Sequence, residues 1–237
     1  MCAGSLWRGV IPVMESCLRP GWALPLLAVV TLAACETAPK SVPKVVAAPP
    51  STKAEVWQGF ANPADLARIQ RVATGWSSGL AEARAGGFRD AIRGEGRLLN
   101  PDAALPRPAP TPGSYSCRMV KLGKEGGKGP AFQKFKPFFC YVQVEGELFT
   151  IVKQTGSQRP AGRLWEDDFP NRMIFLGSLA LGNEDEARAY GDDPKRDMAG
   201  VFERIAPFVW RLVIPYPQDG SRLQVFELTP VAEQPKG

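Results

Sequence analysis

The feature of this chain that most constrains its fold is a succession of short strand-like segments in residues 114–230. Runs of β-branched and aromatic residues alternate there with Gly, Pro, Asn and Asp, and the stretch VFERIAPFVWRLVI has the pattern of a hairpin. In its second strand Trp210, Leu212 and Ile214 share one face, with Arg211 opposite, so at least one face is buried. Consecutive strands with short connections and no helix between them predict an antiparallel sheet, strongly curved or closed as a small up-and-down barrel. The predicted strands lie near residues 114–122, 138–145, 147–154, 162–166, 172–180, 199–205, 208–214 and 222–229.

Residues 56–100 have a helical pattern instead. The stretch from Asn62 to Asp65, NPAD, offers an N-cap, a proline in the first turn and an acidic residue near the helix start. Gly86-Gly87 ends this helix, and a shorter one is expected before the proline-rich linker 101–113. The apolar stripe is too short for a coiled-coil seam, so we expect it to pack on the sheet and give an α+β fold. Its residues are Leu66, Ile69, Ala73, Trp76 and Leu80.

The first 35 residues have the features of a targeting signal. Residues 22–34 form an apolar run, shorter than the about 20 residues that span a bilayer, and it ends in LAAC. This resembles the bacterial lipoprotein box, so residues 1–34 are predicted to be a lipoprotein signal peptide and Cys35 the lipidation site. An ordinary secretion signal is the alternative, and Met14 is an alternative start.

Acyl chains on Cys35 predict a protein anchored to the membrane of the bacterial cell envelope and facing the periplasm. Glu36 stands where an aspartate retains some lipoproteins at the inner membrane, so the outer membrane is expected rather than the inner. Residues 35–55 are rich in Pro, Ala and Lys and are predicted to be a disordered tether, and residues 231–237 a short tail.

Cys117 and Cys140 remain in the mature chain after the signal and the lipid site are set aside. Two cysteines in an oxidising compartment are expected to form a disulfide. Two free buried thiols are the alternative. A metal is less favoured, because two cysteines without histidine leave a tetrahedral site half empty.

The composition excludes several kinds of chemistry. The chain has no histidine, which removes imidazole bases and His-ligated metal or haem sites. Its 29 Lys and Arg against 24 Asp and Glu give a net charge of +5, too small an excess to predict nucleic-acid binding. The lysine-rich segment 121–130 is most simply a solvated hairpin tip, or else a surface for anionic lipid or polysaccharide. No catalytic residue, metal or cofactor is predicted.

Two segments, residues 155–160 and 190–197, hold more hydrogen-bonding groups than their own turns use, and we expect them to meet around Arg159. A structural ion pair from Arg159 to Asp193 or Asp197 is the alternative to a ligand site. Paired aspartates such as Asp167 with Asp168 are a weak signal for an enzyme, since neighbours on a strand point apart. The predicted polar site consists of Thr155, Ser157, Gln158, Arg159, Tyr190, Asp193, Arg196 and Asp197.

The order of several motifs resembles a bacterial envelope family catalogued as domain of unknown function 4893. The motifs are KLG, TGSQRPAGRLW, RMIFLGSLALG, YGDDPKRDMAG, and ERI with WRLVIPYP, and the similarity covers roughly residues 57–230. The resemblance implies an exported single-domain protein and carries no activity, cofactor or catalytic residue to this chain.

These patterns together predict a lipid-anchored periplasmic accessory or binding protein, with an envelope protein or an anionic polysaccharide as its expected partner. A histidine-free envelope hydrolase that uses carboxylates is one alternative, and it requires a pocket with two carboxylates about 5–9 Å apart. A lipocalin-like carrier of an apolar ligand is another, and it requires an open apolar cavity in the barrel.

Overall fold

The computed structural model describes residues 51–182 and 184–232. The predicted signal peptide, Cys35, most of the predicted tether and residues 233–237 lie outside the described residues.

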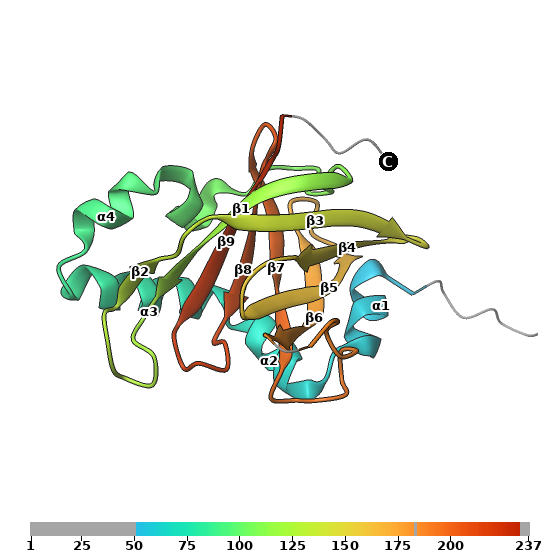
Figure 1. Ribbon diagram of the computed structural model, residues 1–237, viewed down its shortest axis with the longest axis horizontal. Coiled ribbons are helices and arrows are strands. Elements are labelled where there is room, and N and C mark those ends of the chain that lie inside the picture. The colour runs from blue at the N-terminus through green and yellow to red at the C-terminus, as the bar shows by residue number, and fades with distance from the viewer. Residues whose placement is uncertain (1–50, 183, 233–237) are drawn as a thin grey trace, which may run out of the picture. The chain divides into compact units, whose positions relative to one another are not determined.

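Eight antiparallel strands form a closed barrel (Figure 1). Each pairs with the next along the chain, and β1 pairs with β9 to close the cylinder. The predicted barrel is therefore confirmed, and a ninth strand, β2 (Phe132–Lys134), pairs only with the end of β1. The barrel strands are β1 (Gly113–Leu122), β3 (Phe138–Glu145), β4 (Leu148–Lys153), β5 (Gln158–Glu166), β6 (Met173–Leu181), β7 (Asp197–Ala206), β8 (Val209–Pro215) and β9 (Leu223–Pro230).

The interior of the barrel is filled by its own side chains. Alternate residues of each strand point inward, as the pleat requires. On β8, Trp210, Leu212 and Ile214 belong to the interior cluster, whereas Val213 packs in a second cluster on the outer wall. The alternation predicted for this strand is confirmed. The buried interior residues are Tyr115, Cys117, Cys140, Val142, Ile151, Leu164, Met173, Phe175, Met198, Phe202, Trp210, Leu212, Ile214, Phe226 and Leu228.

The helices precede the barrel in the sequence and cover part of its outer wall. Helix α1 lies against β5 and α2 against β7, and their apolar residues share one buried cluster with residues of β6 and β7. Helix α3 packs on β1, β8 and β9. Strands β6, β7 and β8 are consequently buried along most of their length. No helix in residues 51–182 or 184–232 is long and apolar enough to span a membrane. The helical elements are α1 (Lys53–Phe60), α2 (Pro63–Gln70), α3 (Val72–Ala85), α4 (Arg89–Gly94) and the 3-10 turns η1 (Gly96–Leu99) and η2 (Pro101–Ala103).

Three predicted boundaries differ from the structure. Helix α1 begins at Lys53, inside the predicted tether, because Thr52 and Glu55 form a capping box. The single helix predicted after Asn62 is two, α2 and α3, separated at Arg71. Strand β5 begins at Gln158, so part of the predicted polar turn is the start of a strand.

The lysine-rich segment is a hairpin tip, as predicted, except at residues 121–123, which are buried. Residues 124–130 are exposed. Lys121 lies on β1 instead and is 6% exposed, and its ammonium group forms ion pairs with Glu125 and, at 2.7 Å, with Asp219. This lysine is therefore part of the fold rather than of a surface for anions.

The predicted disulfide between Cys117 and Cys140 is confirmed. The two residues lie on the neighbouring strands β1 and β3, with their Cα atoms 5.9 Å apart, and both are buried in the barrel interior. The bond joins two strands of one sheet, at the seam where β1 meets β3.

Candidate functional site

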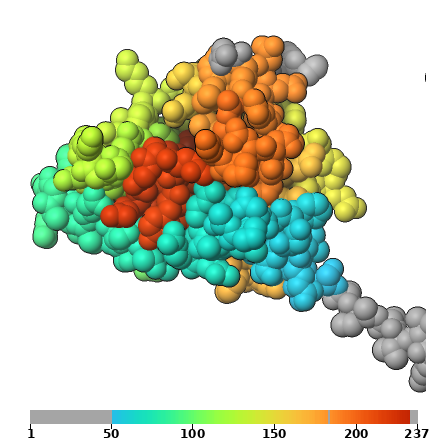
Figure 2. All heavy atoms as spheres, turned by 90° about the horizontal axis from the view of Figure 1, so that it is seen from below, coloured from blue at the N-terminus to red at the C-terminus, as the bar shows by residue number. Residues whose placement is uncertain are grey.

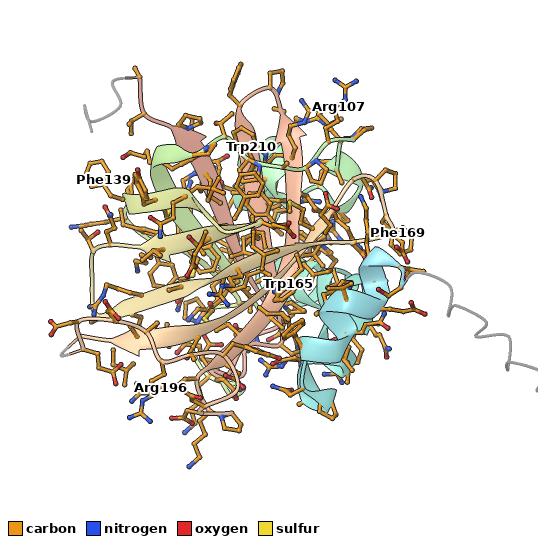
Figure 3. All side chains as sticks on the ribbon, turned by 90° about the vertical axis from the view of Figure 1, so that its right-hand side faces the viewer. Arg107, Phe139, Trp165, Phe169, Arg196 and Trp210 are labelled. Atoms are coloured by element: carbon orange, nitrogen blue, oxygen red, sulfur yellow. A yellow bond between two sulfur atoms is a disulfide. The ribbon has the colours of Figure 1, made fainter. Side chains whose placement is uncertain are left out.

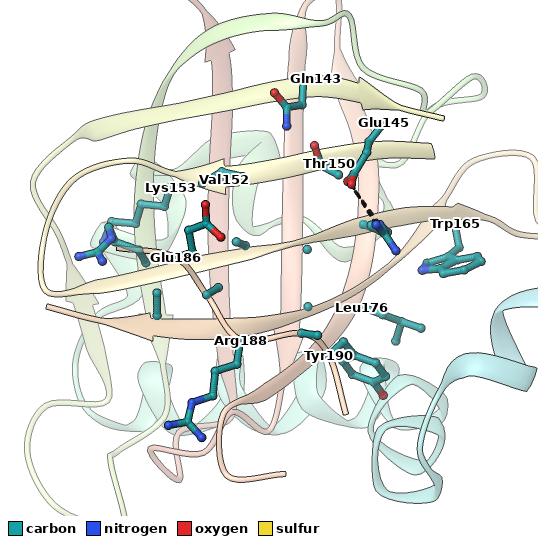
Figure 4. Close-up of a pocket in the computed structure, with 18 of the residues that line it drawn as sticks. Gln143, Glu145, Thr150, Val152, Lys153, Trp165, Leu176, Glu186, Arg188 and Tyr190 are labelled. Atoms are coloured by element: carbon teal, nitrogen blue, oxygen red, sulfur yellow. Dashed lines mark hydrogen bonds and ion pairs between the residues drawn. The ribbon is translucent and has the colours of Figure 1, made fainter. Parts of the chain in front are cut away.

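A large pocket among the described residues is a groove on the outer wall of the barrel, which we call the wall groove. It has a volume of about 570 Å³ and lies across β3, β4, β5 and β6. The segment 185–190 and Phe60 of α1 border it. Figure 4 shows Lys153 at one end of the wall groove and Trp165 at the other.

Small residues make the floor of the wall groove. Ala161 and Ala180 present only methyl groups, and Gly162 and Gly177 are directly paired across β5 and β6. A Cβ atom at Gly162 would lie 2.5 Å from the Cα atom of Gly177, and one at Gly177 would lie 2.3 Å from the carbonyl oxygen of Ala161. The close approach of these strands therefore requires glycine at both positions.

The barrel interior has much less room than the wall groove. A pocket inside the barrel, lined by Phe138, Phe175, Phe226 and, at its edge shared with the wall groove, Lys153, has a volume of about 20 Å³. Ligand sites commonly have volumes of roughly 300–1,000 Å³. The wall groove, and not the interior, has the size of a ligand site.

Charged side chains follow the wall groove. Arg163 forms an ion pair with Glu145 across the groove, with Nη2 and Oε1 3.0 Å apart. Lys153 is half-buried, and burial together with the nearby charge of Arg159 lowers the pKa of its ammonium group. Arg188, on the bordering segment, is half-exposed and lies 3.9 Å from Glu184.

An aromatic pair lies at the other end of the wall groove. The rings of Phe60 and Trp165 are 4.4 Å apart and tilted by 30°, and Trp165 lies beside α1 (Figure 3). Within the described residues, the indole nitrogen of Trp165 and the hydroxyl of Thr150 are buried and have no hydrogen-bond partner. Such atoms are uncommon in folded proteins, and both belong to residues that line the groove.

Arg159 lines the wall groove, but its partners are not the residues predicted around it. Its guanidinium donates to the backbone carbonyls of Gly156, at 3.0 Å, and Leu181, at 3.2 Å, and also to that of Glu184. The side chain of Glu184 in turn accepts from Arg196. The two predicted segments therefore meet through Glu184, a residue that lies in neither of them.

Tyr190 and Asp197 belong to a second cluster, which fixes the segment after β6 to α2. The hydroxyl of Tyr190 donates to Asp65 at 2.7 Å, and the side chain of Asn62 donates to both Asp65 and Asp197. Burial and the negative charge of Asp65 raise the pKa of Asp197, and burial and the same carboxylate raise the pKa of Tyr190. Figure 2 shows α2 and this segment in contact on one face of the molecule.

The prediction of one polar site around Arg159 is therefore wrong in its arrangement. Oδ2 of Asp193 lies 3.5 Å from Nε of Arg196, three residues later in the same segment. Figure 3 shows Arg196 well separated from Trp165. The missing partners Glu184, Asn62 and Asp65 come from other parts of the chain. The predicted residues Thr155, Ser157 and Gln158 are exposed.

The paired aspartates Asp167 and Asp168 follow the end of β5, and both bind α1. Asp167 accepts from the indole of Trp57 at 3.0 Å and pairs with Arg172 at 2.5 Å. Asp168 accepts from the backbone of Ala54 at 3.3 Å. Neither carboxylate lines the wall groove. Across residues 51–182 and 184–232, no group of three or more His, Cys, Asp or Glu side chains is arranged to hold a metal ion.

Comparison with known proteins adds one finding. A family model described as a domain of unknown function (DUF4893) matches residues 57–228, which is most of the chain and includes the whole wall groove. No curated protein and no solved structure gives a significant match.

Proposed function

The chain belongs to the DUF4893 family, a domain of unknown function, and on that premise we propose that it is a ligand-binding protein of the bacterial envelope. The wall groove is its binding site, and Cys35 is its lipid anchor. The observation that carries the proposal is the contrast in volume between the wall groove, about 570 Å³, and the barrel interior, about 20 Å³.

Two further features of the wall groove support binding there. The groove combines an apolar floor and an aromatic pair with charged side chains of both signs, so it offers a ligand both apolar and polar contacts. It also lies on the part of the outer wall that α2 and α3 leave uncovered, since these helices pack on β7, β8, β9 and β1. A ligand therefore reaches the groove without any opening of the barrel.

The location rests on the sequence. The apolar run that ends in LAAC supports acylation of Cys35, and residues 36–52 separate that cysteine from the first helix. A chain of this length reaches at most about 60 Å when it is extended. The domain therefore acts close to the membrane surface.

The anchor is tested by metabolic labelling with a palmitate analogue. Wild-type protein is expected to be labelled and Cys35→Ser to be unlabelled, because the thiol is the acylation site. Labelling of Cys35→Ser at the wild-type level would refute the anchor.

The wall groove is tested by filling it. Ala161→Phe places a ring over the groove floor, and Thr229→Phe places the same ring on an exposed position of β9 outside the groove. In native mass spectrometry of the protein purified from its envelope in mild detergent, wild type and Thr229→Phe are expected to carry a co-purifying small molecule. Ala161→Phe is expected to lose it. The same mass on Ala161→Phe, or its absence from all three proteins, would contradict binding in the groove.

A further inference from the structure

The order of the side chains along the wall groove indicates the chemical class of its ligand. Resting on the proposed function, we propose that the wall groove binds a short acidic saccharide. A sugar carboxylate lies between Lys153 and Arg159 at one end, and a sugar ring packs on the Phe60–Trp165 pair at the other.

Lys153 and Arg159 form a cationic end of the wall groove. Both groups gather at Gly156, where Arg159 donates to the carbonyl and a Cβ atom would lie 3.5 Å from Nζ of Lys153. Within the described chain, neither residue has a carboxylate within 4.0 Å, and Lys153 instead lies over the ring of Phe138, 4.2 Å from its centre. Burial lowers the pKa of the Lys153 ammonium group, and the nearby charge of Arg159 adds to this shift. A bound carboxylate between the two cations offsets their repulsion.

The middle of the wall groove offers both donors and acceptors. Gln143 and the Glu145–Arg163 ion pair line it on one side, and Glu186 lines it on the other (Figure 4). A hydroxyl group both donates and accepts hydrogen bonds, so a polyhydroxylated ligand satisfies such a mixed set. A purely anionic ligand satisfies only the donors. This lining favours a saccharide over a simple organic acid.

The aromatic end favours a flat apolar surface. Phe60 is 61% exposed and stacks on Trp165, so a large ring face is open at this end. The C–H face of a pyranose ring is apolar and packs on such a surface, which gives the contact without burying the sugar hydroxyls.

The length of the wall groove fits several sugar rings. Arg159, Ala161, Arg163 and Trp165 alternate along β5 and line the groove in that order. A strand rises about 3.3 Å per residue, so about 20 Å separates the first from the last. The charged and aromatic ends are therefore too far apart for one ring, and a short oligomer joins them.

A peptide of the same charge is the less favoured occupant. Peptides commonly bind to a sheet by adding a strand at a free edge. Strands β3, β4, β5 and β6 each pair with a neighbour on both sides, so their backbone groups are already used. The wall groove lies on the face of the sheet, and recognition there depends on side chains.

The proposal is tested by calorimetric titration of the full-length protein in non-ionic detergent with trigalacturonate and with the neutral maltotriose. Wild type is expected to bind trigalacturonate at least about tenfold more tightly than maltotriose, because only the former carries carboxylates. Lys153→Met is expected to remove this preference. Lys195→Met, which removes an exposed lysine outside the groove, is expected to keep it. Phe60→Ala is expected to weaken the binding of both saccharides.

Three outcomes would overturn the saccharide. The first two are no binding of trigalacturonate and equal binding of the two saccharides by wild type. The third comes from a further titration with triglutamate, whose binding as tight as that of trigalacturonate would assign the groove to an acidic peptide. Each leaves the proposed function standing as long as Ala161→Phe loses the co-purifying molecule. The two ideas therefore fail separately.

Discussion

Replacing Arg211 with Met is expected to destabilise the protein by about 3–5 kcal/mol, as the removal of one partner from a buried ion pair does. Arg211 lies on β8, and its side chain is 0% exposed beneath η1 and η2. Its guanidinium pairs with Glu203 at 2.6 Å and lies 5.0 Å from the ring centre of Trp76. It also donates to four backbone carbonyls, those of Arg97, Leu98, Asn100 and Pro101.

The loss of stability arises because this one side chain donates hydrogen bonds to four backbone carbonyls of the 3-10 turns and their flanks. A methionine fills part of the volume but leaves the four carbonyls and the carboxylate of Glu203, which are buried or partly buried, without this donor. Lysine keeps the charge but has no planar fork, so Arg211→Lys is expected to be destabilised as well, by about 2 kcal/mol.

Urea unfolding followed by tryptophan fluorescence measures both effects. Arg93→Met is the matched control, because that arginine has a side chain that is 79% exposed on α4, and its loss is expected to change the free energy of unfolding by less than about 0.5 kcal/mol. A loss below about 1 kcal/mol for Arg211→Met would show that this arginine does not hold the 3-10 turns on the barrel.

The barrel was predictable because its signals are local. The alternation of Trp210, Leu212 and Ile214 and the turn residues between strands each lie within a few positions of the chain. Strand β2 was not predictable, because its three residues are a strand only through pairing with the end of β1. The helix break at Arg71 has a similar cause, since the apolar spacing continues across it while α2 packs on β7 and α3 on β8.

The wall groove could not be predicted for a different reason. Its floor depends on the register that places Gly162 opposite Gly177, and a shift of one residue would move these positions to other partners. Nothing in the sequence near Arg159 identifies Glu184 as its neighbour. Polar groups did identify Arg159 and Tyr190, which both line the groove, but their hydrogen-bond partners depend on the folded chain.

The second large effect is expected from the disulfide. Replacing Cys117 and Cys140 together with alanine is expected to lower the free energy of unfolding by about 3 kcal/mol, since the bond closes a loop with a sequence separation of 23. The bond joins β1 to β3, and this pairing has fewer paired residues than the pairing of β1 with β9. β1 pairs with β9 from Tyr115 to Leu122, but with β3 only from Gly113 to Cys117. The variant is therefore expected to keep its barrel and to open first between β1 and β3.

Two measurements separate the bond from simple loss of packing by the thiols. A reductant is expected to lower the unfolding midpoint of wild type in urea and to leave that of the double variant unchanged, because only wild type has a bond to lose. Hydrogen exchange is expected to accelerate, in reduced wild type, at the amides that pair β1 with β3. The amides that pair β1 with β9 are expected to stay protected. Recovery of Cys117 and Cys140 as alkylated thiols from protein unfolded without reductant would contradict the bond, and an unchanged midpoint on reduction would contradict its energetic role.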